Sequence, residues 1–192
     1  MSTPTATGSR PTTRPASPLI RHPHVDDGAQ MWRVARDSVR LDLNPPYAYI
    51  LWARDFHSTS VVAEVDGAVV GFVTGYLRPE EPTTLMVWQV AVDRSQRGQG
   101  LAGQMLDELA RRTGAYTLET TITADNPASR RLFEAFAARH AAQHSVSGLF
   151  ATEHFPDDQD WKPEQLHRIT PLRTTARSHH QPGVDARARS HS

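Results

Sequence analysis

"QVAVDRSQRGQGLAGQMLDEL", residues 89–109, joins an apolar run to an amphipathic run through two glycines. The apolar run predicts a buried strand, and the amphipathic run predicts a helix. The apolar residues of that helix fall on one face, namely Leu101, Met105, Leu106 and Leu109. Gly98 and Gly100 carry no side chains, so backbone N–H groups there can converge on an anion at the start of the helix. A purely structural turn also uses such glycines, so both interpretations stay open at this point.

The turn lacks the signatures of two other phosphate-binding motifs. It has no Gly-Lys-Ser/Thr ending, which a P-loop requires. The GxGxxG spacing of a dinucleotide site is not met, and the preceding apolar runs read as a meander instead of a βαβ unit. We therefore predict neither a P-loop nor a dinucleotide-binding domain.

The rest of the chain predicts strands and helices on both sides of this turn. Asp66-Gly67, between the two apolar runs of 59–77, is a strong hairpin signal. The other expected strands are 18–23, 83–93, 115–123 and two late ones near 145–149 and 166–169, and the expected helices are 27–38, 47–55, 101–113 and 126–140. The order β-α-α-β-β-β-α-β-α-β-β predicts an α/β (α+β) fold, a mixed and mostly antiparallel sheet flanked by helices.

Length and composition predict one folded domain with two unpatterned ends. A chain of 192 residues with 38% hydrophobic residues favours a single domain. Residues 1–17 and 173–192 have no apolar period, so we expect them to be disordered and 18–172 to form the domain. We expect neither a signal peptide nor a membrane span, because there is no apolar leader and no run of about 20 apolar residues. A cytoplasmic protein is the expectation.

The formal net charge is zero, but it is unevenly distributed. The chain has 21 cationic and 21 acidic side chains; two arginines lie in 1–17, and four arginines and one aspartate lie in 173–192, which leaves 15 cationic and 20 acidic side chains in the domain. An acidic domain argues against nucleic acid, which needs a basic face, and is compatible with a cationic substrate. The chain has no cysteine, hence no cysteine nucleophile and no disulfide. The ten histidines show no metal-ligand spacing, so we expect no metal site.

The glycine turn and a second motif together resemble the GNAT superfamily of acyl-CoA N-acyltransferases. Its pyrophosphate motif is Q/R-x-x-G-x-G/A, on which residues 97–102 fall, and "TADNPASRRLF", residues 123–133, resembles its second cofactor segment. The resemblance implies a GNAT-type fold with acetyl-CoA as co-substrate and no metal. The residues that it implies for cofactor binding are Val90, Val92, Arg97, Gly98, Gln99, Gly100, Leu101, Ala102 and Asn126.

The resemblance does not identify a general acid. Many GNAT enzymes place a tyrosine in the helix after the asparagine, but Phe133 stands in that neighbourhood and cannot donate a proton. The remaining candidates are Tyr47 and Tyr49, with Glu119 as a base and the backbone N–H of Val90 as an oxyanion donor. Glu119 can instead be an exposed carboxylate on a strand face, and the tyrosines can be one edge of an amphipathic helix.

Segments outside the cofactor motifs indicate the acceptor. Residues 41–64, which begin with "LDLNPPYAYILW", together with 73–93, 123–133 and 163–169, resemble the L-2,4-diaminobutyrate acetyltransferases of the ectoine pathway within that superfamily. The resemblance covers about 20–172 and implies direct transfer to the γ-amine of a small diamino acid by a homodimer. The substrate-binding residues proposed on that basis are Asp42 and Glu153 for ammonium groups, Trp88 as a π face or wall, and Asn44 or a nearby arginine for the carboxylate.

Other interpretations stay open. A GNAT acetyltransferase for another small amine or for a protein N-terminus would share the donor motifs, although a protein acceptor needs an open groove. A GNAT-fold acyl-CoA sensor without activity would also account for Phe133. At the level of single residues, Asp42 can be a turn brace and Trp88 can belong to the core.

Overall fold

The computed structural model describes residues 17–38 and 41–173. Its centre is one seven-stranded sheet in the order β1-β2-β3-β4-β5-β7-β6. Neighbouring strands are antiparallel except β4 and β5, which are parallel. The expected mixed sheet and the expected order of elements are confirmed. The terminal segments expected to be disordered lie, except for Ser17 and Arg173, outside the described residues.

The boundaries of the elements agree with the expected ones to within a few residues. The strands are β1 (Leu19–Arg21), β2 (Val61–Val65), β3 (Ala68–Arg78), β4 (Glu81–Val92), β5 (Thr117–Thr123), β6 (Gln143–Phe150) and β7 (Glu164–Thr170). The helices are α1 (Gly28–Ser38), α2 (Pro46–Asp55), α3 (Leu101–Thr113) and α4 (Pro127–Arg139). The hairpin turn lies at Asp66 and Gly67, whose φ angles of 50° and 78° are both left-handed.

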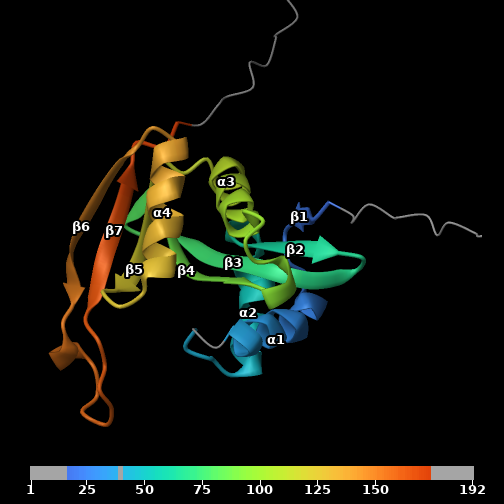
Figure 1. Ribbon diagram of the computed structural model, residues 1–192, viewed down its shortest axis with the longest axis horizontal. Helices are drawn as coiled ribbons and strands as arrows, with labels where there is room; N and C mark the ends of the chain where they lie inside the picture. The colour runs from blue at the N-terminus through green and yellow to red at the C-terminus, as the bar shows by residue number, and fades with distance from the viewer. Residues whose placement is uncertain (1–16, 39–40, 174–192) are drawn as a thin grey trace, which may run out of the picture.

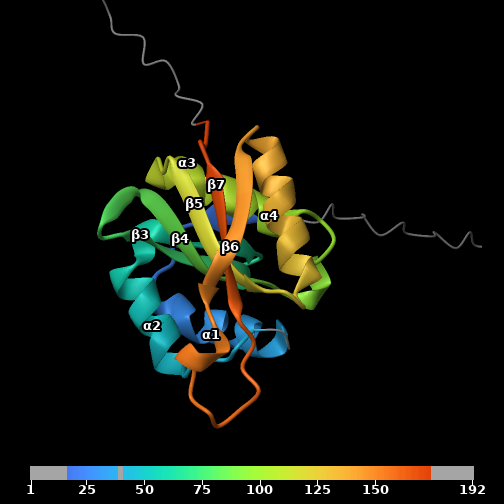
Figure 2. The same ribbon diagram turned by 90° about the vertical axis from the view of Figure 1, so that its left-hand side faces the viewer.

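Helices cover both faces of the sheet. Helices α3 and α4 pack on one face over an apolar cluster that includes Leu85, Met105 and Phe136. Helices α1 and α2 pack on the other face over a second cluster that includes Met31 and Phe72 (Figure 1). Strand β6 lies at the outer edge of the sheet, beside β7 (Figure 2). The second cluster draws its strand residues from β2, β3 and β4, so α1 and α2 leave that face of β5, β6 and β7 uncovered.

An ion pair connects β1 to the start of α1. Arg21 donates to both carboxylate oxygens of Asp27, at 2.6 and 2.9 Å. Asp27 Oδ2 also accepts the backbone N–H of His24 at 2.6 Å, which closes the turn before the helix. Asp27 thereby completes a capping box from within the short 3-10 turn Val25–Asp27.

Strand β4 contains a β-bulge at Trp88. On β3, Thr74 pairs with Gln89 and Gly75 pairs with Val87, so Trp88 has no register partner there. The extra residue changes which face the side chains take. Val87 accordingly belongs to the cluster under α3 and α4, whereas Ala91 belongs to the cluster under α1 and α2.

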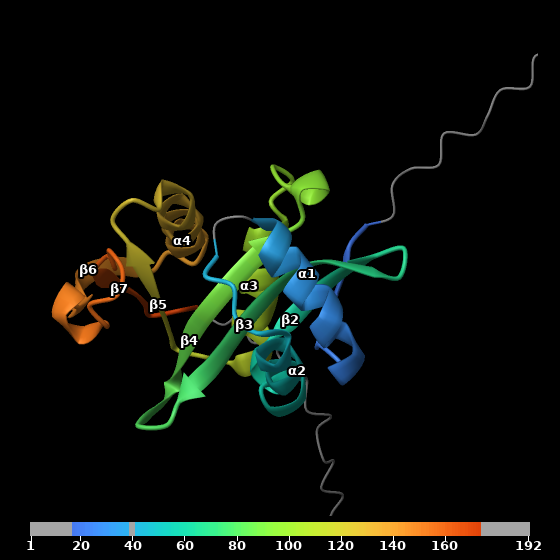
Figure 3. The ribbon, with the colours of Figure 1, turned by 90° about the horizontal axis from the view of Figure 1, so that it is seen from below.

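Beyond this bulge, β4 and β5 separate. Their parallel register runs from Thr84–Thr117 to Val87–Thr120 and then ends, and Figure 3 shows the two strands diverging from a common end. The N–H of Gln89 points toward β3, where Thr74 Oγ1 accepts it at 3.2 Å. Because successive N–H groups point to opposite edges of a strand, those of Val90 and Val92 point into the gap. The divergence therefore creates an open strand edge inside the molecule.

Candidate functional site

Two cavities adjoin where β4 and β5 separate. One has a volume of about 450 Å³ and lies beside the glycine turn; we call it the turn cavity. The other has a volume of about 310 Å³ and lies beside Trp88; we call it the acidic cavity. Both are lined by Leu41, Val90, Asn126 and Ser129, so they meet at the open edge of β4.

The turn cavity is built by the glycine turn and the strand edge. Gly98 and Gly100 have φ angles of 78° and 73°, which glycine adopts without strain. Gly100 directly precedes α3, so the N-terminus of that helix opens at the turn. Arg97 lines the cavity, and its Nε donates to the main-chain oxygen of Val92 at 2.9 Å. The turn therefore lies against the free edge of β4.

A second helix also begins at the turn cavity. Asn126 caps α4, because its Oδ1 accepts the backbone N–H of Ser129 at 3.1 Å. Helix N-termini favour anions, and Arg131 of α4 adds a positive charge to the cavity wall. Arg131 was not identified from the sequence, because only the helix register places it on this wall. The cavity suits an elongated anionic ligand.

The other residues expected at the cofactor site are arranged as follows. Val90, Val92, Arg97, Ala102 and Asn126 line the turn cavity. Leu101 is buried in the apolar core, so its backbone N–H alone is available to a ligand. Gln99 is exposed, and its side chain donates to the main-chain oxygen of Ser95 at 3.4 Å.

The acidic cavity has two carboxylates in its wall. Asp42 and Glu164 line it, and no lysine or arginine of the described residues does so. Burial raises the pKa of the Glu164 carboxyl, and the negative charges of Asp42 and Asp125 raise it further against a hydrogen bond from Thr121 that lowers it. Glu164 Oε2 is buried without a hydrogen-bond partner among the described residues. This site can bind ammonium groups and accept a proton.

The segment of residues 41–44 is held against β4 by hydrogen bonds. Gln89 Nε2 donates to the main-chain oxygen of Asp42 at 3.0 Å, and Asn44 Nδ2 reaches the same oxygen at 3.4 Å. Tyr49 is buried behind them, where burial raises the pKa of its hydroxyl although Asn44 and Gln89 act in the opposite direction. Asp42, Asn44 and Trp88, which were expected to bind substrate, thus lie around one cavity.

The two tyrosines expected as proton donors line neither cavity. Tyr47 is 69% exposed, whereas Tyr49 packs edge-on against Phe72 in the core. Helix geometry is the reason, since two residues along α2 rotate the side chain by roughly 200°. The face that carries Tyr49 packs on the sheet, and Tyr47 points to the surface.

Glu119 and Glu153 also lie away from the acidic cavity. Glu119 is 2% exposed, so the interpretation as an exposed strand carboxylate is wrong. It is engaged by the guanidinium groups of Arg168 and, at 3.2 Å, Arg78, which occupy the lone pairs that a base would use. Glu153 lies exposed in the 3-10 turn Thr152–His154 between β6 and β7. The second acid of the cavity is Glu164, which only the β5–β7 register brings there, opposite Thr123.

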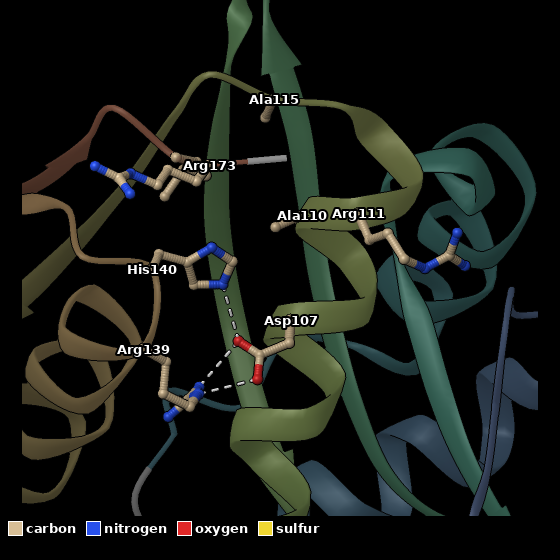
Figure 4. A pocket seen from close by; sticks show the side chains of 8 residues that line it. Asp107, Ala110, Arg111, Ala115, Arg139, His140 and Arg173 are labelled. Carbon is tan, nitrogen blue, oxygen red and sulfur yellow. Dashed lines mark hydrogen bonds and ion pairs between the residues drawn. The ribbon is translucent and has the colours of Figure 1, made fainter. Parts of the chain in front are cut away.

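A third cavity, of about 270 Å³, lies between the C-terminal ends of α3 and α4. Its one acidic side chain has two partners in the lining, because Asp107 accepts from Arg139 at 3.0 and 3.1 Å and lies 3.1 Å from His140 Nε2 (Figure 4). It shares no lining residue with the other two cavities. Within 17–38 and 41–173 there is neither a group of acidic, histidine and cysteine side chains fit for a metal ion nor a helix able to cross a membrane.

Comparison with known proteins decides the family. The model of the Acetyltransferase (GNAT) family matches residues 27–138, from the start of α1 to the end of α4. The chain belongs to the GNAT acetyltransferase family. The GNAT-type fold expected from the two cofactor motifs is thereby confirmed.

Several GNAT relatives share one name. An L-2,4-diaminobutyric acid acetyltransferase of Streptomyces coelicolor (strain ATCC BAA-471 / A3(2) / M145) is 54% identical over 80% of this chain and 92% of that protein. One from Nocardia farcinica (strain IFM 10152) is 51% identical over 80% of each chain. A solved structure of the Paenibacillus lautus diaminobutyrate acetyltransferase, in complex with L-2,4-diaminobutyric acid and coenzyme A, has a TM-score of 0.77 and 39% identity. The match covers 81% of this chain and 95% of the Paenibacillus lautus chain.

Proposed function

We propose that this GNAT enzyme transfers the acetyl group of acetyl-CoA to the γ-amine of L-2,4-diaminobutyrate, as a step of ectoine biosynthesis. The observation that carries the proposal is the acidic cavity, which adjoins the turn cavity and is lined by Asp42 and Glu164 but by no lysine or arginine of the described residues. The acetyltransferases named above, at 51% and 54% identity, support the same reaction.

Acetyl-CoA is the donor in this proposal. Backbone N–H groups of residues 97–102 bind its pyrophosphate, as the left-handed glycines and the start of α3 allow. The pantetheine arm lies along the open edge of β4 and pairs with Val90 and Val92. Arg97 and Arg131 offset the negative charge of the phosphates.

Diaminobutyrate is the acceptor, with two ammonium groups and one carboxylate. Asp42 and Glu164 bind the ammonium groups, and the Trp88 ring forms a wall beside them. The Asn44 amide, one of several neutral donors in the cavity wall, binds the carboxylate. Glu119 and Glu153, which the sequence indicated as a base and a second anion, have no part in this arrangement because neither lines the cavity.

Glu164 acts as the proton acceptor. Its raised pKa makes the carboxylate more basic than an exposed glutamate, so it removes a proton from the γ-ammonium and leaves a neutral amine. The amine attacks the thioester carbonyl, and the N–H of Val90, which points into the gap, stabilises the oxyanion. The C–S bond then breaks, the new amide loses its second proton, and the thiolate of coenzyme A gains one. No acyl-enzyme forms, since the chain has no cysteine.

Steady-state kinetics with acetyl-CoA and a series of amines test the proposal. The wild-type kcat/KM should be highest for diaminobutyrate, above ornithine and lysine. Asp42→Ala should raise the KM for diaminobutyrate about fivefold, as expected for one partly exposed ion pair, and leave the KM for acetyl-CoA unchanged. Asp55→Ala, at an exposed aspartate on α2 that lines neither cavity, is the matched control.

Two results would contradict parts of the proposal. Wild-type turnover that is no faster with diaminobutyrate than with lysine or ornithine would overturn the acceptor. An equal rise of both KM values in Asp42→Ala would assign Asp42 a structural role only. Turnover with any amine separates an enzyme from an acyl-CoA sensor.

The assembly and the location of the enzyme are also proposals. We propose a homodimer, because the edge strand β6 exposes three apolar side chains, Val146, Leu149 and Phe150. Sedimentation of the wild type and of Val146→Lys tests it, and a wild-type monomer at micromolar concentration would contradict it. A cytoplasmic location agrees with the use of acetyl-CoA, and cell fractionation tests it.

A further inference from the structure

Three aromatic rings form a continuous stack next to the acidic cavity. Trp52 lies between Phe56 and Trp88, with ring centroids 4.6 Å from Phe56 and 4.3 Å from Trp88. The interplanar angles are 26° and 29°, so the rings lie nearly face to face. Only Trp88 of the three lines the cavity.

The aromatic stack sets the orientation of the Trp88 ring, which the pairing of β4 with β3 leaves undetermined. Trp88 is the bulge residue of β4 and has no register partner on β3, so the ladder does not determine the direction of its ring. Trp52 and Phe56 lie four residues apart, at the C-terminal end of α2, and therefore share one side of the helix. That helix side meets Trp88 and covers one face of its indole.

The remainder of the Trp88 indole is available to a ligand. The residue is 40% exposed, although it lies on a central strand of the sheet. Asp42 and Glu164 line the same cavity and draw cations into it. A cation in this cavity is stabilised both by the charge of the two carboxylates and by a cation–π interaction with the exposed part of the indole.

The contact with Trp88 is what distinguishes Trp52 from Trp32. The Nε1 atoms of both side chains are buried without a hydrogen-bond partner among the described residues, so the unpaired N–H is common to the two. Of the two indoles, Trp52 is the one that stacks on Trp88. Comparing variants at the two positions therefore isolates the effect of the stack.

We propose that Trp52 is a positioning residue: it holds the Trp88 indole as an ammonium-binding wall of the acidic cavity and thereby contributes to the choice of a cationic acceptor. The inference rests on the proposed function and deepens it, since it concerns how the same site recognises its amine. Trp52 acts through Trp88 and has no contact with the substrate itself.

The first measurement is spectroscopic and needs no substrate. Two indoles stacked at this distance couple, and the coupling gives a paired signal of opposite signs in the far-ultraviolet circular dichroism spectrum. Trp52→Phe and Trp88→Phe should each abolish the pair of signals, and the two difference spectra should match. Trp32→Phe is the matched control, because Trp32 lies on α1 against Arg36 and away from both cavities.

The second measurement separates positioning from stability. Trp52→Leu, which removes the ring, should raise the KM for diaminobutyrate about fivefold while the KM for acetyl-CoA changes by less than about twofold. Trp52→Phe retains a ring between Phe56 and Trp88, so it should recover most of the loss. Trp32→Leu should leave both KM values unchanged, and thermal unfolding of each variant shows that it is folded.

Each outcome decides for or against the inference. A wild-type enzyme without activity on diaminobutyrate overturns the proposed function, whereas the paired signal still reports on the stack. An active wild type in which Trp52→Leu leaves the KM for diaminobutyrate unchanged, or raises both KM values equally, overturns the positioning role. A wild-type spectrum without the paired signal also overturns it. If Trp52→Leu does not fold, a KM for Trp52→Phe equal to that of Trp88→Leu overturns the role, and a value near that of the wild type supports it.

Discussion

Gln89 and Asp42, which lie 47 positions apart in the sequence, are joined by a hydrogen bond of 3.0 Å from Gln89 Nε2 to the main-chain oxygen of Asp42. Gln89 is nearly fully buried on β4, whereas Asp42 lies at the surface. The position of residues 41–44 is therefore set by β4, the strand whose open edge lines both cavities. Strand β4 thus contributes to the walls of both the acidic cavity and the turn cavity.

We expect Gln89→Leu to weaken acceptor binding selectively. The change removes the donor to Asp42 at similar side-chain volume, so the KM for diaminobutyrate should rise about fivefold, as for the loss of one hydrogen bond of about 1 kcal/mol. The KM for acetyl-CoA should change by less than about twofold, and steady-state kinetics measure both. Gln143→Leu, on exposed β6, is the control. Equal changes in both KM values would contradict a role confined to the acceptor side.

Glu164→Gln should remove the proton acceptor. We expect kcat to fall by about 10²- to 10⁴-fold with little change in thermal stability. In the wild type, kcat/KM should fall on the acid side as Glu164 is protonated, with an apparent pKa above the ordinary glutamate value of 4.5, because burial raises it. The pH dependence of kcat/KM between about pH 4 and pH 9 measures this limb.

Glu153→Gln is the matched control for that variant. Glu153 is exposed and lines neither cavity, so its kinetics should equal those of the wild type. A large loss in Glu153→Gln would restore Glu153 as the second anion for the substrate, and an active Glu164→Gln enzyme would contradict Glu164 as the proton acceptor.

Arg21→Met should destabilise the fold. Asp27 is 5% exposed, so without Arg21 its carboxylate is buried with no cation, and we expect a loss of about 2 to 3 kcal/mol in chemical unfolding. Burial alone would raise the pKa of Asp27, but Arg21 and the N–H of His24 lower it overall. The stabilisation is therefore present above the ordinary aspartate pKa of 3.8 and is lost as the pH falls through the lower folded value. Arg36→Met, at an exposed pair, should cost less than about 0.5 kcal/mol.

His167 should make the stability of the enzyme depend on pH. Burial lowers the pKa of His167, and the charges of His144 and Arg130 lower it further while Glu134 opposes them. The unfolded chain then binds more protons, so stability should be lost as the pH falls below about 6.5 and approaches the folded pKa. Melting temperatures between about pH 8 and pH 5 measure this loss.

His167→Gln should flatten that dependence, and His154→Gln, at an exposed histidine, should leave it intact. His144 contributes to the lowered pKa of His167, because His144 Nε2 lies only 2.9 Å from His167 Nδ1. A wild type whose melting temperature is constant over this range would contradict the prediction.

The fold was predictable from local patterns because each signal acts over a few residues. The Asp66-Gly67 turn, the glycines before α3 and Gly114 after it mark where the backbone takes left-handed angles. The donor site follows from the same kind of signal, since its N–H groups belong to one continuous stretch. Of the residues that line the acidic cavity, the sequence singled out Asp42, Asn44 and Trp88 for the acceptor.

The remaining site residues depend on contacts between distant segments. Glu164 reaches the acidic cavity because β7 pairs with β5, and no local pattern distinguishes it from Glu153. Glu119 was a candidate base because it lies on the strand before Asn126, with an exposed strand carboxylate as the alternative, but it is buried and paired with Arg78 and Arg168. The bulge at Trp88 also had no signal in the sequence, although it decides which face the following residues take.

The short register between β4 and β5 has a consequence for the lifetime of the protein. The β4–β5 register has only four residue pairs, from Thr84–Thr117 to Val87–Thr120. In the proposed complex the donor arm lies along Val90 and Val92 and supplies the backbone hydrogen bonds that β5 does not, and a ligand that binds only the folded chain stabilises it more as its concentration rises. We therefore expect the β4–β5 junction to open to proteases more readily when acetyl-CoA is scarce. The abundance of the enzyme would then follow the supply of its own donor.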